Sequence, residues 1–182
     1  SRGLVGSEMC IRDSPNIVSK IGDICIQTYK ENSIGTIIKH IPGHGLAKVD
    51  SHFSTPYINK SLQYLLKNDF KAFKNKNSFF AMTGHLIFNQ IDKVNTVTHS
   101  RKMIDIIRKK VGFRNLLISD DLSMKSLKKG LKINTIDTFK AGCNLALHCN
   151  GKLKEMEIVG KNSPLVSKFI IKKTSQFYNI LR

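Results

Sequence analysis

The feature that most constrains this chain is the alternation of short, continuously apolar runs with amphipathic helical segments. Strands are predicted at residues 36–40, 78–85, 115–121 and 144–150. Helices, marked by apolar side chains at helical spacing, are predicted at residues 16–30, 61–73, 101–111, 134–142 and 163–181. Apolar strands that are separated by helices are typical of an α/β fold with a parallel sheet covered on both faces.

Polar side chains gather at the carboxyl end of each predicted strand. They are Lys39–His40, His85, Asp120–Asp121 and Asn150. In parallel α/β folds the functional site is built at this edge of the sheet. The alternation by itself does not distinguish a (β/α)₈ barrel from an open, doubly wound sheet. A barrel usually needs about 250 residues, so the four strand–helix units of this 182-residue chain correspond to about half of one.

The chain is strongly basic, with a formal net charge of +17. A basic chain first suggests a nucleic-acid partner. The lysines are nevertheless scattered through every predicted helix and loop, without an arginine-rich arm or a basic–aromatic motif. We therefore expect a solvated lysine surface, which could help to attract acidic substrates, and no nucleic-acid partner.

Hydrophobic content and cysteine spacing indicate a globular protein of a reducing compartment. Apolar residues make up 41% of the chain, no apolar run approaches the ~20 residues of a membrane span, and no secretion signal is recognisable. The four cysteines show no CxxC spacing, and Cys143 and Cys149 flank an apolar run. We expect buried, reduced thiols, a cytoplasmic location, no membrane association and a monomer.

The first fourteen residues, SRGLVGSEMCIRDS, differ in character from the rest of the chain. They lack periodicity and the Lys/Asn/Ile bias of the sequence that follows. Because LVGSEMCIRDS resembles translated adaptor sequence, we interpret residues 1–14 as a non-native segment. Residues 15–182 are then expected to form one domain that continues upstream in the natural protein. The alternative is that residues 1–14 are an ordinary N-terminal segment.

The segment KHIPGHGLAKVDSH, residues 39–52, concentrates side chains that can do chemistry. His40, His44, Asp50 and His52 are all potential zinc ligands, but their spacing across a Pro–Gly loop matches no strong zinc signature. A loop with incidental histidines is a second interpretation. The third is acid–base chemistry. Asp50 and His52 share one side of an extended segment, where the carboxylate can orient the imidazole and raise its basicity.

The motif ISDDLSM places two carboxylates at the end of the third predicted strand. One of them can point into a barrel mouth while the other turns towards helix N-terminal amides. Asp121, which precedes Leu-Ser-Met, has the pattern of a helix N-cap. Asp120 is therefore the better candidate for a reacting carboxylate, and the alternative is that both residues only cap the next helix.

Four motifs, in this order, give the chain a specific resemblance. KHIPGHGLAKVDSHFSTP, MTGH, ISDDLSM and AGCNLALHCN resemble the bacterial β-N-acetylglucosaminidases of glycoside hydrolase family 3, except that Ile41 stands where the family usually has Phe. The resemblance extends from about residue 15 to the C-terminus. It implies that residues 15–182 are the C-terminal part of a (β/α)₈ TIM-type barrel, in which parallel strands alternate with helices. It implies no cofactor and no metal.

The resemblance also implies a retaining hydrolase that forms a covalent glycosyl-enzyme. Asp120 would be the nucleophile at the anomeric carbon. His52 would protonate the leaving oxygen and then activate water, with Asp50 as its partner. A histidine in this role departs from the usual pair of carboxylates in glycosidases, and it agrees with the isolated aspartate and the Asp–His pair found from the residues themselves.

Further residues are implied to bind the sugar or to shape the site. Lys39 and His40 would hydrogen-bond sugar hydroxyls. His85 would line the site, with a packed histidine as the alternative. Thr55, which precedes a proline, would fix the exit of the loop that carries His52.

The family resemblance implies a substrate with a terminal β-linked N-acetylglucosamine. In the cytoplasm such residues come from peptidoglycan turnover fragments, N-acetylglucosamine linked to anhydro-N-acetylmuramic acid, which bear carboxylates. Two other classes remain open. One is a non-catalytic sugar- or nucleic-acid-binding protein on the same scaffold, and the other is an enzyme that transfers the sugar to phosphate instead of water.

Half a barrel would expose two sheet edges and an open core. We therefore expect this polypeptide alone to be poorly stable or inactive, although the complete gene product would be active. The assay is hydrolysis of 4-nitrophenyl N-acetyl-β-glucosaminide by the 182-residue chain. Turnover comparable with that of full-length relatives would refute this expectation.

Overall fold

The computed structural model describes residues 14–181 of the chain. The segment interpreted as non-native, residues 1–14, therefore lies outside the described residues except for Ser14. Ser14 caps helix α2 (Pro15–Glu31), because its Oγ accepts a hydrogen bond from the amide of Ile17 at 3.4 Å. Proline follows at the first helical position, where its missing amide proton costs nothing.

Four parallel strands form the central sheet, in the order β1–β3–β5–β6. They are β1 (Ile37–Ile41), β3 (Phe80–Thr83), β5 (Leu116–Asp121) and β6 (Leu145–Leu147). Phe80 pairs with Ile37 on one side and with Leu116 on the other, so these three strands start in register. The predicted parallel strands alternating with helices are confirmed.

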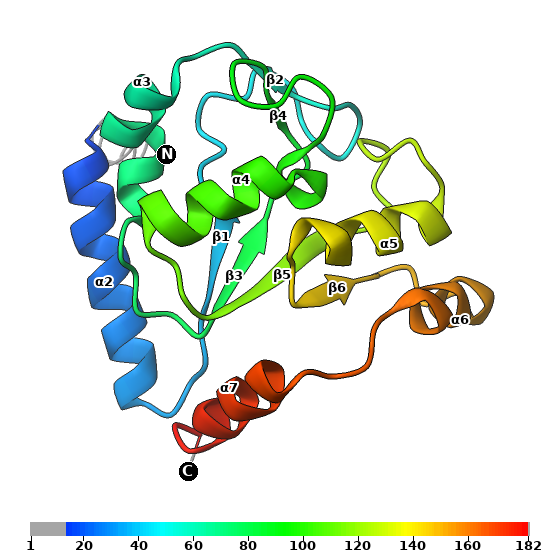
Figure 1. Ribbon diagram of the computed structural model, residues 1–182. Coiled ribbons are helices and arrows are strands. Elements are labelled where there is room, and N and C mark those ends of the chain that lie inside the picture. The colour runs from blue at the N-terminus through cyan, green and yellow to red at the C-terminus, as the bar shows by residue number, and fades with distance from the viewer. Residues whose placement is uncertain (1–13, 182) are drawn as a thin grey trace, which may run out of the picture.

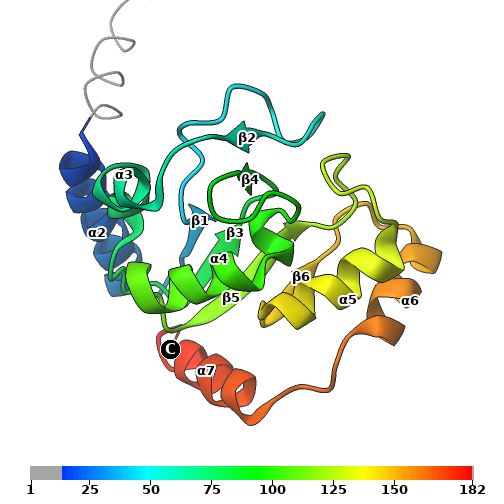
Figure 2. The same ribbon diagram turned by 45° about the horizontal axis from the view of Figure 1, so that its top comes forward.

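The arrangement of the helices is that of a barrel that is not closed. Helices α4 (Arg101–Ile106) and α5 (Leu131–Ala141) cross the same face of the sheet, as Figure 1 and Figure 2 show. The strand order rises along the chain without the reversal of a doubly wound sheet. Within the described residues, β1 and β6 are the two edges of the sheet.

The main core fills the space between the sheet and the elements that pack on it. Its largest fully buried side chains come from α3 (Leu62–Lys67), the 3₁₀ turn Asp69–Phe73, α4 and the strands. They include Leu65, Phe70, Phe88, Met103, Ile107, Phe113 and Leu117. Phe70 and Phe88 meet edge to face, with ring centroids 5.1 Å apart, a favourable geometry for aromatic pairs.

A second, two-stranded sheet extends above the carboxyl ends of the central strands. It consists of β2 (Tyr57–Ile58) and β4 (Ile87–Phe88), paired in parallel. The sequence did not predict it, because two residues are too few to show periodicity. This small sheet anchors the segments that leave β1 and β3, so it restricts where the loops around the site can lie.

Some predicted helix bounds are corrected by the structure. The helix predicted at 61–73 breaks at Asn68, whose backbone leaves the helical region and whose side chain donates to the Tyr64 carbonyl at 2.9 Å. The helix predicted at 101–111 does end at Gly112, which is left-handed, and its last turn, Ile107–Val111, is a π-helix. The C-terminal region holds two helices instead of one, α6 (Leu153–Asn162) and α7 (Lys168–Tyr178).

The cysteines of the described region do not share one environment. Cys143 is buried, and burial raises the pKa of its thiol to about 12. Cys25 and Cys149 are exposed. The prediction of buried thiols is therefore wrong for these two residues, because Cys25 lines an open pocket between α2 and β1 and Cys149 follows the edge strand β6. No helix of the described residues is long and apolar enough to cross a membrane.

Helix α2 is attached to the rest of the molecule by a buried lysine. The Lys76 ammonium, whose side chain is 5% exposed, donates to the Ser19 carbonyl at 2.9 Å, to the Ser19 hydroxyl at 2.6 Å and to the Asp23 carboxylate at 2.6 Å. All three acceptors lie on α2. Ile26 is the one residue of α2 that is classed as buried, so this polar contact holds a helix that buries little apolar surface.

Replacing Lys76 by Met should destabilise the chain by about 1–3 kcal/mol, because the carbonyl and hydroxyl of Ser19 lose their donor while Asp23 remains largely solvated. Lys74→Met is the matched control, since Lys74 is exposed two residues away. Urea denaturation of both variants measures the difference. Equal midpoints for the two variants would show that the buried ammonium does not hold α2.

Candidate active site

The two strands that flank β3 bring the first pair of site residues together. His40 lies near the end of β1 and Asp120 near the end of β5, and their side chains approach across β3, with Nε2 of His40 3.4 Å from Oδ2 of Asp120. The Asp120 side chain is 14% exposed. The register of β1 against β3 shifts between Lys39 and Ile41, so His40 is an extra residue of β1 at the point where its ring meets Asp120.

The two adjacent aspartates at the end of β5 have different surroundings. Asp120 accepts the amide of Asp121 at 2.9 Å. Asp121 accepts the amide and the hydroxyl of Ser123, at 3.0 and 2.6 Å, and the amide of Cys149 at 3.1 Å. Burial opposes ionisation of Asp121, but these hydrogen bonds outweigh it and lower the pKa of that carboxyl.

The expected N-cap role of Asp121 is wrong in its detail. The next helix, α5, begins only at Leu131. Asp121 instead caps a turn at Ser123 and ties it to the segment after β6. The Asp121 carboxylate is thereby used to hold the turn, whereas the Asp120 carboxylate contacts the His40 side chain of another strand.

His85 lies beneath the strand ends and has no exposed surface. Its Nε2 is 3.0 Å from the Asp121 carbonyl, which can only accept, so Nε2 donates and Nδ1 accepts from the Thr98 hydroxyl at 2.8 Å. Burial lowers the pKa of His85. The ring supports the backbone of Asp121 from below, and a sugar could contact it only if neighbouring side chains moved.

His40 and Lys39 lie beside an open pocket. The pocket, of about 480 Å³, lies between α2, β1 and the 3₁₀ turn Asp69–Phe73, and neither Asp120 nor His52 lines it. Burial lowers the pKa of His40, although the nearby Asp120 charge acts in the opposite direction. Its imidazole is therefore neutral at pH 7 and able to exchange hydrogen bonds with hydroxyl groups as well as with Asp120.

Asp50 and His52 form the predicted pair on the loop that follows β1. The Nδ1–H of His52 donates to Oδ1 of Asp50 at 2.7 Å, and the same oxygen accepts the His52 amide at 2.8 Å. The hydrogen bond from the His52 side chain to Asp50 raises the pKa of the imidazole. The His52 side chain is 70% exposed, and within residues 14–181 its Nε2 has no hydrogen-bond partner.

This loop is held at both ends although its tip is exposed. At the start, Gly43 passes so close to Asp69 that an added Cβ would lie 2.5 Å from the carboxylate, and Asp69 also accepts the Gly45 amide. At the exit, the Thr55 hydroxyl donates to the Ser126 carbonyl at 2.8 Å, in line with the expected role of Thr55. The loop that carries His52 is thus joined to the loop that follows Asp120.

The structure does not gather the potential metal ligands of the opening motif. Within the described residues, there is no group of three or more His, Cys, Asp or Glu side chains that could hold a metal ion. His40 turns to Asp120, and His52 turns to Asp50. The zinc interpretation of residues 39–52 therefore has no support from the geometry.

One histidine near the site was not singled out from the sequence. His148 follows β6, and its side chain is 4% exposed. Its Nε2 lies 3.2 Å from a carboxylate oxygen of Glu155 and its Nδ1 lies 3.8 Å from Asp121. A histidine near the end of the strand predicted at residues 144–150 was the available signal, but the partner Glu155 lies on α6, a helix that the sequence did not predict.

Comparisons with known proteins identify the family of the chain. The model of the glycosyl hydrolase family 3 N-terminal domain matches residues 7–174. A β-hexosaminidase of Idiomarina loihiensis is 27% identical over 154 residues, covering 82% of this chain and 47% of that protein. One from Haemophilus influenzae is 35% identical over 120 residues, covering 62% of this chain and 34% of that protein.

Solved structures agree in fold as well. The crystal structure of the β-N-acetylglucosaminidase from Thermotoga maritima is 25% identical and superposes with a TM-score of 0.74. The match covers 92% of this chain and 39% of that one. The chain therefore spans about half the length of the curated relatives it matches, or less.

Replacing Asp50 by Ala should lower the pKa of His52, because the carboxylate that stabilises the imidazolium is lost. The charged fraction of His52 would then disappear at lower pH than in the unchanged chain. An NMR titration of the ring protons measures this, with Asp105→Ala as a control at a carboxylate that pairs only with α4 and π-helix cations. An unchanged His52 titration in the Asp50 variant would contradict the pairing.

Proposed function

The chain belongs to glycoside hydrolase family 3, and from this we propose that it carries the catalytic residues of a retaining β-N-acetylglucosaminidase. The observation that carries the proposal is the hydrogen bond of 2.7 Å between Asp50 and His52, on a loop fastened to the loop that follows Asp120. The names of the relatives, β-hexosaminidase and β-N-acetylglucosaminidase, support the same class of reaction.

The first half of the reaction needs a nucleophile and an acid. Asp120 attacks the anomeric carbon, the glycosidic bond breaks, and the sugar becomes an ester of Asp120. His52 gives the proton on its Nε2 to the leaving oxygen, so that a neutral alcohol departs. The raised pKa of His52 favours this role, since more of the ring is protonated near neutral pH than for an ordinary histidine.

The second half reverses the direction of proton transfer. The now neutral His52 takes a proton from water at Nε2 while the oxygen attacks the anomeric carbon, and the ester bond to Asp120 breaks. Asp50 keeps Nδ1 protonated in both halves, so Nε2 is always the atom that moves the proton. The products are the free sugar and the regenerated carboxylate.

The sugar is held by residues near the end of β1. Lys39 and His40 line the open pocket and offer donors and acceptors for hydroxyl groups. His40 also contacts Asp120 and so can orient the attacking oxygen. His85 acts one step away, through the backbone of Asp121.

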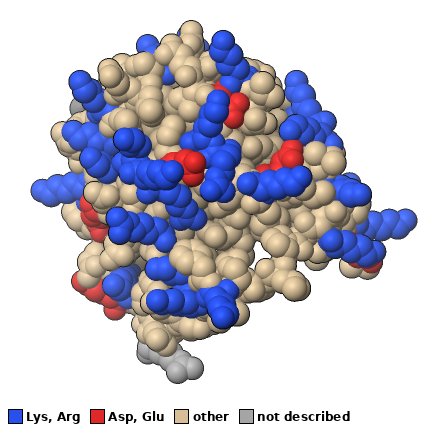
Figure 3. All heavy atoms as spheres, in the orientation of Figure 1, with Lys and Arg blue, Asp and Glu red and all other residues tan. Residues whose placement is uncertain are grey.

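The substrate we propose is a terminal β-linked N-acetylglucosamine on a peptidoglycan turnover fragment in the cytoplasm. Such fragments are anionic. Lysine and arginine side chains are spread over much of the face shown in Figure 3, with acidic side chains between them, and do not form a single stripe. This distribution suits general attraction of an anionic substrate more than the docking of a nucleic acid along one surface.

Replacing Asp120 by Ala should lower kcat on 4-nitrophenyl N-acetyl-β-glucosaminide by at least about a thousandfold, because no other carboxylate takes over the attack. The assay uses the longest open reading frame that contains this sequence. The variant should also lose the covalent glycosyl adduct that mass spectrometry detects with a slow 2-fluoro sugar substrate.

Asp105→Ala, on the outer side of α4, is the control and should keep both the turnover and the adduct. Full activity of the Asp120 variant would refute the role of this residue. Absence of turnover in the unchanged protein, together with sugar binding, would favour a binding protein. Formation of sugar 1-phosphate on addition of phosphate would favour transfer to phosphate.

A further inference from the structure

A second pocket lies outside the proposed active site, on the far side of the loop after β5. It is small, about 120 Å³, well below the roughly 300–1,000 Å³ typical of pockets for drug-sized ligands. The elements around it are β2, β4, the 3₁₀ turn Val97–His99, the loop at residues 126–129 and the start of α5. Neither Asp120 nor His52 lines it.

The lining of this pocket contains buried polar atoms that lack a partner. Within the described residues, six buried side-chain nitrogen or oxygen atoms have no hydrogen bond, and three of them lie here. These three are the hydroxyls of Thr96 and Ser126 and the amide oxygen of Asn134. All three residues are more than nine-tenths buried. Buried polar groups in folded proteins normally have a partner, so their concentration at one cavity indicates an occupant.

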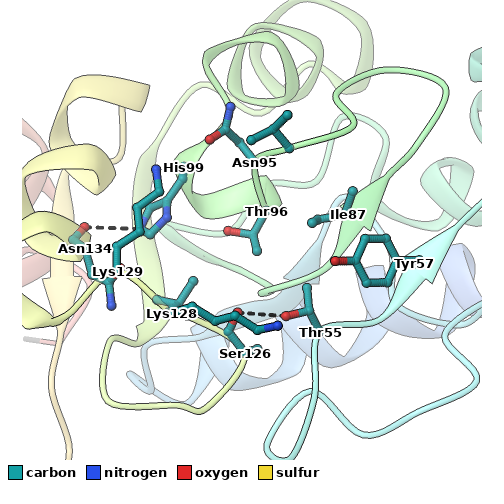
Figure 4. A pocket seen from close by; sticks show the side chains of 12 residues that line it. Thr55, Tyr57, Ile87, Asn95, Thr96, His99, Ser126, Lys128, Lys129 and Asn134 are labelled. Carbon is teal, nitrogen blue, oxygen red and sulfur yellow. Dashed lines mark hydrogen bonds between the residues drawn. The ribbon is translucent and has the colours of Figure 1, made fainter.

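The charge around the pocket is positive. Lys128 and Lys129 are part of its wall, and its lining holds no aspartate or glutamate. Lys129 is neutralised by Asp137 at 2.8 Å, whereas no ion pair of Lys128 is found in the described part of the chain. In Figure 4, Lys128 extends past Ser126 towards Thr55. An anion in the pocket would balance this ammonium.

His99 adds no charge to the pocket. Burial lowers its pKa to about 4. Its Nε2 is 3.1 Å from the Asn134 carbonyl, which fixes Nε2 as the protonated nitrogen. The unpartnered atoms and Lys128 therefore supply two hydroxyls that can donate, one ammonium, and one amide oxygen that can only accept.

We propose that this pocket binds a small oxyanion that keeps one hydroxyl group, of which hydrogen phosphate is the simplest example. The oxyanion accepts from Lys128 and, once the buried side chains of Thr96, Ser126 and Asn134 turn into the cavity, it also accepts from the two hydroxyls, and its own hydroxyl donates to the Asn134 amide oxygen. A fully deprotonated oxyanion such as sulfate satisfies the donors but leaves the Asn134 oxygen unpaired. Phosphate should therefore bind more tightly than sulfate.

A ligand in this pocket would contact two segments that lead to the proposed active site. Its walls come from the segment after His52, through Thr55 and Tyr57, and from the segment after Asp120, through Ser126 and Lys128. An occupant would reinforce the existing hydrogen bond between Thr55 and Ser126. It would thus fix the loop of His52 relative to Asp120, a consequence that rests on the proposed function, whereas the binding itself does not.

The test is an amide NMR titration with inorganic phosphate at constant ionic strength, with sulfate in a parallel series, on the ¹⁵N-labelled product of the longest open reading frame that contains this sequence. Phosphate should cause saturable shifts of the amides of Thr96, Ser126 and Lys128, with an affinity at least about fivefold above that for sulfate. Absence of saturable shifts overturns the site. Equal affinity for sulfate overturns the requirement for a hydroxyl.

Two variants and a control localise the binding. Lys128→Gln should weaken phosphate about tenfold, while Lys125→Gln, an exposed lysine of the same loop outside the pocket, should change it less than twofold. Ser126→Ala should weaken it as well, and it keeps the backbone carbonyl that holds Thr55. Equal effects of the two lysine variants would show attraction by the general positive surface and overturn the proposal.

Because binding is measured without turnover, its failure leaves the proposed hydrolase untouched. Conversely, loss of activity in an Asp120 variant says nothing about phosphate in this pocket, since Asp120 does not line it.

Discussion

The parallel pairing of β1, β3 and β5 is the constraint on which the site depends. Ile37, Phe80 and Leu116 stand at the same level, so the three strands reach their carboxyl ends together. The register of β1 then shifts between Lys39 and Ile41, which brings His40 to the face of Asp120, 3.4 Å away, although 80 residues separate them along the chain. A slip of one residue in β5 would turn Asp120 to the other face of the sheet. The correct strand register is therefore required for the site as well as for the core.

The two adjacent aspartates at the end of β5 have different roles, one structural and one at the site. Asp121 gives its carboxylate to the turn at Ser123 and to the amide of Cys149, and its carbonyl to His85. These contacts fix the backbone from three directions. Asp120 shares that fixed backbone, and within the described residues its Oδ1 accepts the Asp121 amide while its Oδ2 lies 3.4 Å from the ring of His40, so the carboxylate is oriented by one contact at each oxygen.

The sequence predicted the parts of this arrangement that are local. The four strands were recognisable as continuous apolar runs, and the spacing of Asp50 and His52 predicted their pairing. The sheet of β2 and β4 could not be predicted, because its two-residue strands exist only through their pairing. Helix α6 was missed although Leu153, Met156 and Val159 recur in it at helical spacing. The hydrogen bond from Thr55 to Ser126 joins residues that are 71 positions apart, so no local sequence pattern could predict it.

The environments of the histidines explain why His52 is the one suited to move protons. Burial lowers the pKa of His40, His85 and His99, which keeps those rings neutral and fits them for hydrogen bonding. His52 is exposed, so burial has little influence on it, and its contact with Asp50 raises the pKa instead. A mobile acid–base group must be accessible to substrate and yet oriented. The Asp50 carboxylate supplies the orientation that burial supplies elsewhere, and the fastened ends of the loop keep the pair near Asp120.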